Sequence, residues 1–168
     1  MANSTFSGPI RSESTLKTVS KNATTGVITE VTTIGDAPVS LADGNVTLTN
    51  ATHSGRVLAV PALASNRTIT LPAPVAGATF KFIYAGAAEE AQNLIIVTPG
   101  NSNFFLGNVQ HLDTNADNVG VYANGSSNSK LTLTDFGSME INIVAKDSTN
   151  YYIWGNVVSE DAPAFADQ

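Results

Sequence analysis

Residues 67–84, RTITLPAPVAGATFKFIY, decide the fold of this chain. The first apolar side chains of the stretch, Ile69 and Leu71, alternate with threonines, which is the period of a half-buried β-strand. Pro72 and Pro74 follow. A sheet ladder cannot continue through them, because proline has a fixed φ and no N–H donor. The first half of the stretch therefore predicts a strand that ends at a rigid corner.

The second half of the stretch predicts another strand. Gly77 tolerates the positive φ that a turn often needs, and Phe80, Phe82 and Tyr84 then recur at every second position. Since side chains alternate across a strand, these rings lie on one face, and that face is expected to be buried in a core. No residue of the stretch forms a recognisable catalytic motif. The stretch therefore predicts a β scaffold and not an active site.

The composition of the chain favours one domain built from strands. A chain of 168 residues fits one domain with an arm or a tail. The hydrophobic fraction of 42% is enough for a core, whereas the charged fraction of 13% is well below the usual value of about 25%. The polar surface must therefore come from threonine, serine and asparagine, which favour strands and turns over helices.

The composition also argues against several classes of protein. A net charge of −6 disfavours nucleic acid as a partner, because such proteins neutralise phosphates with basic side chains. The lack of cysteine excludes disulfides and thiolate metal sites. The sequence has neither the apolar core of a signal peptide nor a run of about 20 apolar residues. We therefore expect no membrane partner, and synthesis in the cytoplasm of the cell that expresses the protein.

Residues 36–158 predict a single all-β domain of about ten short strands. An Asp-Gly turn at residues 42–45 favours a hairpin, and a second hairpin is expected around a turn at residues 147–150. The run at residues 93–99 is apolar on both faces, which predicts a central strand between two layers. Because no repeat of fixed period occurs, a solenoid is not expected. We predict a β-sandwich or jelly-roll-like domain, with a barrel as the alternative.

The two ends of the chain differ from this domain. Residues 1–35 predict an extended N-terminal arm with short edge strands, which becomes ordered when it binds a partner. The candidate docking residues of the arm are Phe6, Pro9, Ile10 and Arg11. The alternative interpretation is a frayed terminus with one edge strand. Residues 159–168 contain three acidic residues and predict a solvated acidic tail.

The histidines and one Asx-rich segment are weak candidates for metal sites. His53 and His111 have no second histidine and no cysteine nearby in the sequence, whereas zinc needs three or four convergent ligands. Both are expected to be loop or edge residues. Residues 113–118, DTNADN, contain the first oxygen ligands of a calcium loop. However, Asn118 replaces the required glycine and Asn124 the required acid, so an Asx-rich turn is expected instead.

Catalytic motifs are also missing. Glu89 and Glu90 are adjacent and therefore point apart, so they do not form the facing acid pair of a glycosidase. A solvated loop is expected there. The sequence has no G-x-S-x-G nucleophile elbow and no phosphate-binding glycine loop. We therefore predict a protein that is not an enzyme and that has no cofactor, no metal and no catalytic residues.

A group of aromatic residues near the end of the chain has two interpretations. The group contains Tyr122, Tyr151, Tyr152 and Trp154. Exposed together, these rings would form a platform on which a sugar can stack. Because they fall on strand patterns, packing in the core or between subunits is the favoured interpretation.

A second apolar cluster is consecutive in the sequence and consists of Phe104, Phe105 and Leu106. Neighbouring side chains of a strand point to opposite faces, so the three cannot share one sheet face. At least one ring must meet a second layer or another subunit. This cluster is the candidate subunit interface.

Several stretches of the chain resemble the small head decoration (cement) proteins of tailed phages, notably those that infect cyanobacteria and marine bacteria. The stretches are ITLPAPVAGATFKFIY at residues 69–84, KLTLTD at 130–135 and MEINIVAKDSTNYYIWGNV at 139–157. The opening residues MANSTFSGPIRSES and KTVSKNATTG resemble the N-terminal arm of these proteins. Similar strand-turn-strand passages also occur in phage tail fibres.

The resemblance implies a structural virion protein. It implies a β-sandwich or jelly-roll protomer that forms homotrimers, lies on the outer capsid surface and clamps neighbouring major capsid proteins. The family provides no catalytic residues to transfer to this chain. The alternative function is a phage tail-fibre or adhesin module that binds host surface glycans through exposed tyrosine and tryptophan side chains.

Overall fold

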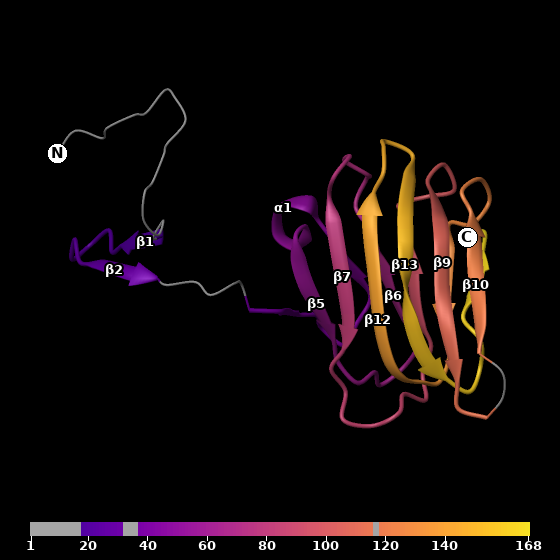
Figure 1. The fold of residues 1–168 in the computed structure, drawn as a ribbon. Helices are drawn as coiled ribbons and strands as arrows, with labels where there is room; N and C mark the ends of the chain where they lie inside the picture. The colour runs from indigo at the N-terminus through magenta and orange to yellow at the C-terminus, as the bar shows by residue number, and fades with distance from the viewer. Residues whose placement is uncertain (1–17, 32–36, 116–117) are drawn as a thin grey trace, which may run out of the picture. The chain divides into compact units, whose positions relative to one another are not determined.

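The computed structural model of the protein describes residues 18–31, 37–115 and 118–168 (Figure 1). The chain divides into two compact units, residues 1–36 and residues 37–168.

In the first unit, β1 (Thr18–Lys21) and β2 (Ile28–Val31) form an antiparallel pair. The turn between them is closed by Asn22, whose Oδ1 accepts hydrogen bonds from the backbone N–H groups of Thr24 and Thr25, each at 2.9 Å. This asparagine satisfies turn donors that would otherwise need water.

The second unit is a two-layer all-β sandwich, as the sequence predicts. The seven-stranded sheet, which faces the viewer in Figure 1, has the order β10 (Val119–Asn124), β9 (Phe104–Asp113), β13 (Asn150–Ser159), β12 (Phe136–Ala145), β7 (Thr79–Tyr84), β5 (Arg56–Val60) and β3 (Val39–Ser40). The five-stranded sheet has the order β14 (Ala164–Ala166), β11 (Lys130–Leu133), β8 (Leu94–Val97), β6 (Arg67–Thr70) and β4 (Val46–Thr47). A single short helix, α1 (Asn50–His53), lies between β4 and β5 among the described residues.

From β3 to β8 the chain winds between the two layers. Successive strands alternate between the sheets, and each of the strands β3 to β6 pairs in parallel with the strand two further along the chain. The corner predicted at Pro72–Pro74 is one of these crossings, since β6 and β7 belong to different sheets. This parallel winding differs from the antiparallel connections of a jelly roll. The parallel winding forms even though the sequence has no repeat of fixed period, which is the usual sign of a wound β structure.

The hairpin predicted around residues 42–45 is wrong, because β3 and β4 lie in different sheets. The side chains of this turn form hydrogen bonds with the first residues of β6 instead. Asp43 Oδ1 accepts a hydrogen bond from Arg67 Nε at 2.7 Å, and Asn45 Oδ1 accepts one from the Thr68 backbone N–H at 2.9 Å. These contacts hold the Asp-Gly segment as a crossing between the layers.

Two other predictions for strands are confirmed. β12 and β13 form the expected antiparallel hairpin, in which Asp147 Oδ1 accepts hydrogen bonds from the backbone N–H groups of Thr149 and Asn150, each at 2.7 Å. The apolar run at residues 93–99 contains β8, which is a central strand as predicted, in the middle of the five-stranded sheet, but it belongs to one of the two layers and does not lie between them. β13 also pairs in parallel with β9, and this pairing links the β12–β13 hairpin to β9 and β10.

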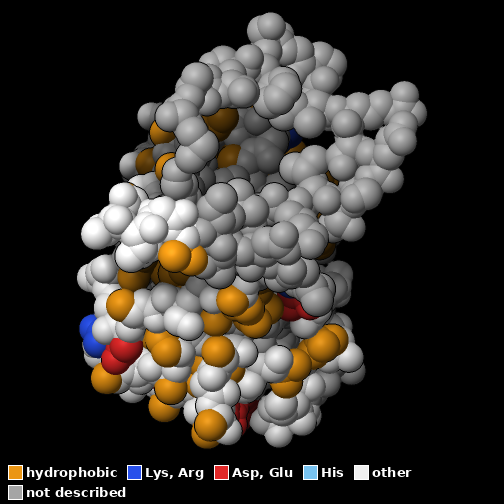
Figure 2. Space-filling model, turned by 90° about the vertical axis from the view of Figure 1, so that its left-hand side faces the viewer, with side chains coloured by type: hydrophobic (Ala, Val, Ile, Leu, Met, Phe, Trp, Pro, Cys, Tyr) orange, Lys and Arg blue, Asp and Glu red, His pale blue; other side chains and the backbone are white. Residues whose placement is uncertain are grey.

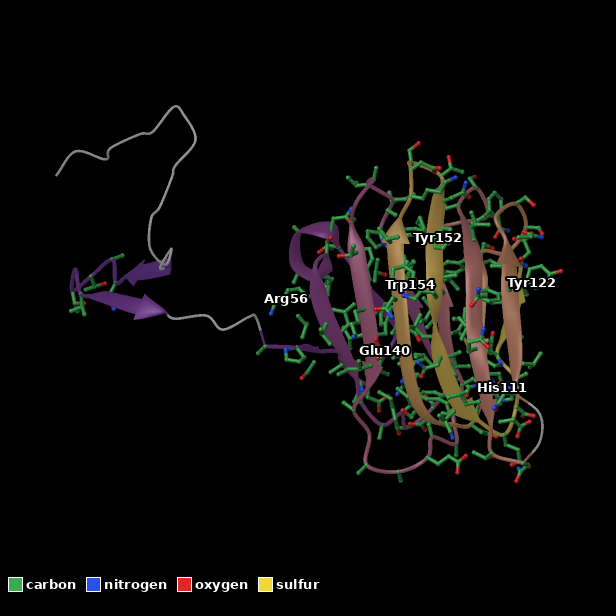
Figure 3. The ribbon with its side chains drawn as sticks, viewed as in Figure 1. Arg56, His111, Tyr122, Glu140, Tyr152 and Trp154 are labelled. Carbon is green, nitrogen blue, oxygen red and sulfur yellow. The ribbon has the colours of Figure 1, made fainter. Side chains whose placement is uncertain are left out.

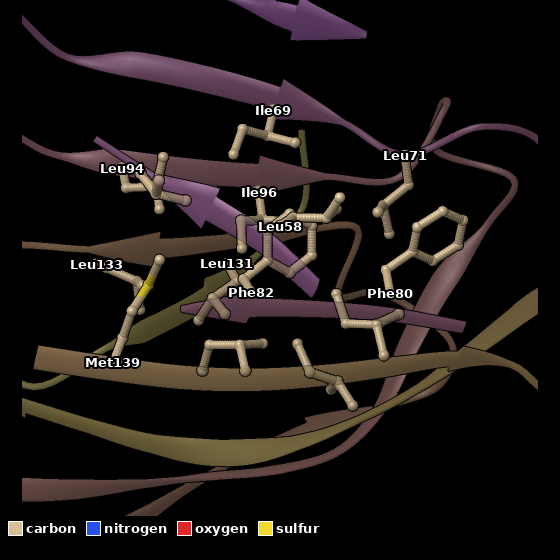
Figure 4. Close-up of a cluster of buried hydrophobic side chains, with 14 of the residues drawn as sticks. Leu58, Ile69, Leu71, Phe80, Phe82, Leu94, Ile96, Leu131, Leu133 and Met139 are labelled. Carbon is tan, nitrogen blue, oxygen red and sulfur yellow. The ribbon is translucent and has the colours of Figure 1, made fainter. Parts of the chain in front are cut away.

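The core fills the space between the two sheets (Figure 4). Phe80 and Phe82 are 1% and 0% exposed, so the face predicted from residues 67–84 is indeed buried. Tyr84, on the same face, is half-buried and packs edge-on against Phe136 with ring centroids 5.0 Å apart. The aromatic rings of this core are expected to contribute more stability than any ion pair on the surface.

The predicted solvated tail at residues 159–168 is a further difference. Residues 164–166 form β14, which pairs with β11 at the edge of the five-stranded sheet. The ring of Phe165 lies 6.2 Å from that of Phe105, and the Gln168 side-chain amide donates to the Thr98 carbonyl at 3.0 Å. The apolar contact and these hydrogen bonds bind the segment to the domain despite its acidic residues.

Tyr151 joins β13 to the corner after β6. Its ring is fully buried, and its hydroxyl donates a hydrogen bond to the Pro72 carbonyl. Burial raises the pKa of Tyr151 to about 12, because the phenolate would lose its hydration. The folded chain therefore retains this proton at pH values where the unfolded chain, with an ordinary pKa of about 10, loses it.

We expect Tyr151 to make the fold sensitive to alkali. Its contribution to the free energy of unfolding is constant below pH 10 and falls as the pH rises from about 10 towards 12, by about 3 kcal/mol in total. Tyr151→Phe removes this decline but costs about 1 kcal/mol at neutral pH through the lost hydrogen bond. Urea unfolding of both proteins across this pH range measures the difference. Parallel pH profiles for the two proteins would contradict the assignment.

Candidate functional site

The outer surface of the seven-stranded sheet carries the largest exposed aromatic side chains of the described residues. Tyr152 and Trp154 are each 45% exposed and lie two positions apart on β13, and Tyr122 on the β10 edge is 75% exposed (Figure 3). We call the surface formed by these three residues and by Lys81, Asn108, Glu140 and Asn142 the aromatic face. Alternation along the strands produces it, because the residues between them point into the core.

The register of the strands places Trp154 between two asparagines. Trp154 pairs with Asn142 of β12 on one side and with Asn108 of β9 on the other, and Asn108 pairs in turn with Tyr122 of β10. The rings of Tyr152 and Trp154 have centroids 6.5 Å apart. One row across four strands therefore alternates aromatic rings with carboxamide groups.

The charges on the aromatic face are paired. Lys81 Nζ lies 2.8 Å from Glu140 Oε1, and the Asn142 side-chain amide donates to the same oxygen at 3.4 Å. The hydrogen bond from Lys81 lowers the pKa of Glu140 below its usual value, and the amide of Asn142 adds to the effect. The Glu140 carboxylate is therefore ionised at neutral pH, and it forms an ion pair with Lys81. An exposed pair of this kind contributes little to stability.

A hollow of about 290 Å³ opens beside Trp154. Its walls come from β5, β7, β12 and β13, and the lining residues are Gly55, Arg56, Val57, Thr79, Phe80, Lys81, Asn142, Ile143 and Trp154. The walls are mainly apolar, with a few amide, hydroxyl and ammonium groups and the Arg56 guanidinium among them. Figure 2, which views the molecule from the β5 side, shows hydrophobic side chains among white atoms, with a few charged side chains. This combination is typical of small ligand sites in proteins.

The residues of the predicted sugar platform are partly separated by the fold. Tyr122, Tyr152 and Trp154 share the aromatic face, whereas Tyr151 points into the core and cannot contact a ligand there. Tyr122, Tyr152 and Trp154 therefore do not pack in the core, and for these three residues packing between subunits stays a prediction.

The candidate subunit interface is also divided. Phe105 is fully buried within its own chain, so the hypothesis that it contacts another subunit is wrong. It meets the second layer instead, where its ring lies 6.3 Å from that of Tyr151. Phe104 and Leu106 are half-buried on the opposite side of β9. The proposed docking residues of the arm, Phe6, Pro9, Ile10 and Arg11, lie outside the described residues.

The two histidines and Glu90 have structural environments that the sequence did not predict. His111 is 2% exposed on an inner strand, where its Nε2 lies 3.1 Å from the Ser159 carbonyl. His53 lies in α1, and its Nδ1 accepts from the Thr49 backbone N–H at 3.0 Å. Glu90 is buried, whereas a solvated loop was predicted there. Its carboxylate accepts a hydrogen bond from the Leu63 backbone N–H at 2.7 Å.

The segment that partly resembles a calcium loop is held by its own turn contacts. Asp113 Oδ1 accepts from the Asn115 backbone N–H at 2.6 Å, and Asn118 Oδ1 accepts from the Asp113 N–H at 3.0 Å. Within residues 18–31, 37–115 and 118–168, no group of three or more His, Cys, Asp or Glu side chains is placed to hold a metal ion.

The fold and the site together define an all-β sandwich with a neutral aromatic face. Comparisons of the chain with models of protein families, with curated proteins and with solved structures found no match. No helix in the described part of the chain is long and apolar enough to cross a membrane.

Proposed function

We propose that this protein is a structural virion protein that binds the outer surface of a phage capsid and stabilises the capsid by clamping neighbouring major capsid proteins. The observation that carries the proposal is the division of the chain into a short N-terminal unit, residues 1–36, and a compact sandwich, residues 37–168. A clamp needs such an attachment segment and a rigid body. The resemblance of residues 69–84, 130–135 and 139–157 to phage cement proteins supports the same function.

The N-terminal segment has the chemistry of a docking arm. Phe6 and Ile10 offer apolar anchors, and Pro9 restricts the backbone between them, which reduces the entropy lost on binding. Residues 1–21 contain three basic residues and one acidic residue, although the whole chain has a net charge of −6. This local excess of positive charge favours an acidic capsid surface. Many weak copies of one contact then strengthen the shell together, and a homotrimer multiplies the contacts further.

A second candidate function is the binding of host surface glycans, as in a phage fibre or adhesin module. One specific observation favours it, namely that Tyr122, Tyr152 and Trp154 are exposed on one face of the sheet. The two functions use different parts of the chain and are compatible in one virion protein.

We expect deletion of residues 1–14 to abolish capsid binding while the sandwich remains folded. The assay is sedimentation of the protein with capsids assembled from the major capsid protein encoded with it. A finer test replaces Phe6 and Ile10 with alanine, which should weaken binding at least tenfold, since each lost anchor costs about 1–2 kcal/mol. The matched control, with Ser4 and Ser12 replaced by alanine, should bind normally. Full occupancy by the truncated protein would refute the arm's role.

A further inference from the structure

We propose that the aromatic face binds an uncharged oligosaccharide, with one sugar ring in the hollow beside Trp154 and the next rings lying along the row towards Tyr122. The inference deepens the second candidate function and rests on it. It does not depend on capsid binding, because it involves only residues of the sandwich.

Aromatic exposure is the first observation behind the proposal. Trp154 and Tyr152 are each about half-exposed, and Tyr122 is mostly exposed, although the inner face of the same sheet has a complete core without them. Large rings in water lose the free energy that burial would provide, so their exposure needs another explanation. The C–H face of a pyranose packs against such a ring, while the sugar hydroxyls stay hydrated at its rim.

Carboxamides beside the central ring provide the polar half of the site. Asn142 and Asn108 flank Trp154 on the two neighbouring strands. A carboxamide both donates and accepts hydrogen bonds, as a sugar hydroxyl does, so each asparagine can contact one or two hydroxyls of a ring stacked on Trp154. The side chains are short and start from strands of a central sheet, which limits the entropy lost on binding.

The paired charges select an uncharged ligand. Glu140 and Lys81 lie next to Asn142 and neutralise each other at 2.8 Å. An acidic sugar would have to approach the Glu140 carboxylate, and a cationic ligand would approach the Lys81 ammonium. A protein partner that covered the face would remove both charges from water, with a desolvation cost that a hydrated sugar avoids. The face therefore favours a neutral saccharide over a polypeptide.

The dimensions of the site fit a chain of sugars. The hollow of about 290 Å³ lies at the small end of ligand sites, which range over roughly 300–1,000 Å³, so it accepts one ring. Trp154 and Tyr122 are separated by one intervening strand, β9, and hence by about 10 Å. A short oligosaccharide that runs across the strands can therefore contact both aromatic rings.

The position of the tryptophan provides a direct assay, since Trp154 is the only tryptophan of the chain. Its fluorescence is titrated with short oligosaccharides of glucose, galactose, mannose and N-acetylglucosamine. We expect a saturable change in emission with at least one series. Asn142→Ala, which keeps the fluorophore, should weaken that binding about tenfold. Asn115→Ala, which changes an exposed asparagine in the loop after β9, should leave it unchanged.

Calorimetric titration with the best saccharide extends the test to the ring itself. Trp154→Ala should abolish measurable binding, and Trp154→Phe should restore part of it. Urea unfolding of each variant checks that the outward-facing substitutions leave the sandwich folded. The proposal would be overturned if no series gave a saturable response. It would also be overturned if Asn142→Ala and Trp154→Ala bound the saccharide with the same affinity as the unsubstituted protein.

The same variants separate this proposal from capsid binding. If Trp154→Ala still decorates capsids but no longer binds sugar, the aromatic face is a glycan site distinct from the arm. The opposite result is that Trp154→Ala loses capsid binding and that no saccharide alters the Trp154 fluorescence of the unsubstituted protein. In that case the aromatic face contacts the capsid protein and the glycan proposal is wrong.

Discussion

Gly155→Ala is expected to unfold the sandwich or to leave it severely destabilised. Gly155 lies in the middle of β13 with φ +155°, a conformation that L side chains rarely adopt. A Cβ atom at this position would lie 2.0 Å from the Glu140 carbonyl oxygen and 2.9 Å from Ile141 Cα. These atoms belong to the β12 backbone, which is paired on both sides and cannot move aside without breaking a ladder.

The expected loss in the free energy of unfolding is about 4 kcal/mol or more, a size reached when backbone strain and a buried clash combine. Urea unfolding followed by fluorescence measures it. Gly137→Ala is the matched control on β12, because its Cβ would lie in ordinary contact, 3.9 Å from the Val158 carbonyl oxygen. A Gly155→Ala protein as stable as the control would show that the β12–β13 register is incorrect.

Phe105→Ala is expected to cost about 3–5 kcal/mol, the usual penalty for removing a fully buried aromatic ring. The ring contacts both Tyr151 of β13 and Phe165 of β14, so its loss leaves a cavity between the sheets and releases the C-terminal strand. Hydrogen exchange should then report faster exchange in residues 164–166 than in the hairpin of β12 and β13.

Phe104→Ala provides the comparison, since it removes the same side chain one position away, where the ring is only half-buried. We expect a cost below about 2 kcal/mol for that variant. If instead Phe105→Ala left stability intact and lowered the mass measured by light scattering, Phe105 would lie between subunits, contrary to its position in the core.

Local patterns were sufficient to predict much of the fold. Alternation predicted that Phe80 and Phe82 are core residues, and both are buried. Each of these predictions needed only the two-residue period of a strand. The same period placed the exposed rings of β13 on one surface, although packing was the favoured interpretation.

Features that depend on strand order could not be predicted. The Asp-Gly turn at residues 42–45 favoured a hairpin locally, but Arg67 and Thr68 on the next winding supplied its partners. Likewise, the acidic residues at the end of the chain predicted a solvated tail, but Phe165 packs against Phe105. Phe105 lies far away in the sequence, so no local pattern reveals this contact. The row that joins Asn142, Trp154, Asn108 and Tyr122 needs the pairing of four strands. No pattern within one strand contains that information.

The measurement that tests the central proposal most directly is electron cryomicroscopy of capsids incubated with the full-length protein. We expect saturable, ordered density for the sandwich on the outer surface, with each copy or trimer contacting more than one major capsid protein and the N-terminal residues lying against the shell. Capsids that remain bare at saturating concentrations of folded protein would contradict the proposal and leave glycan binding as the remaining candidate function.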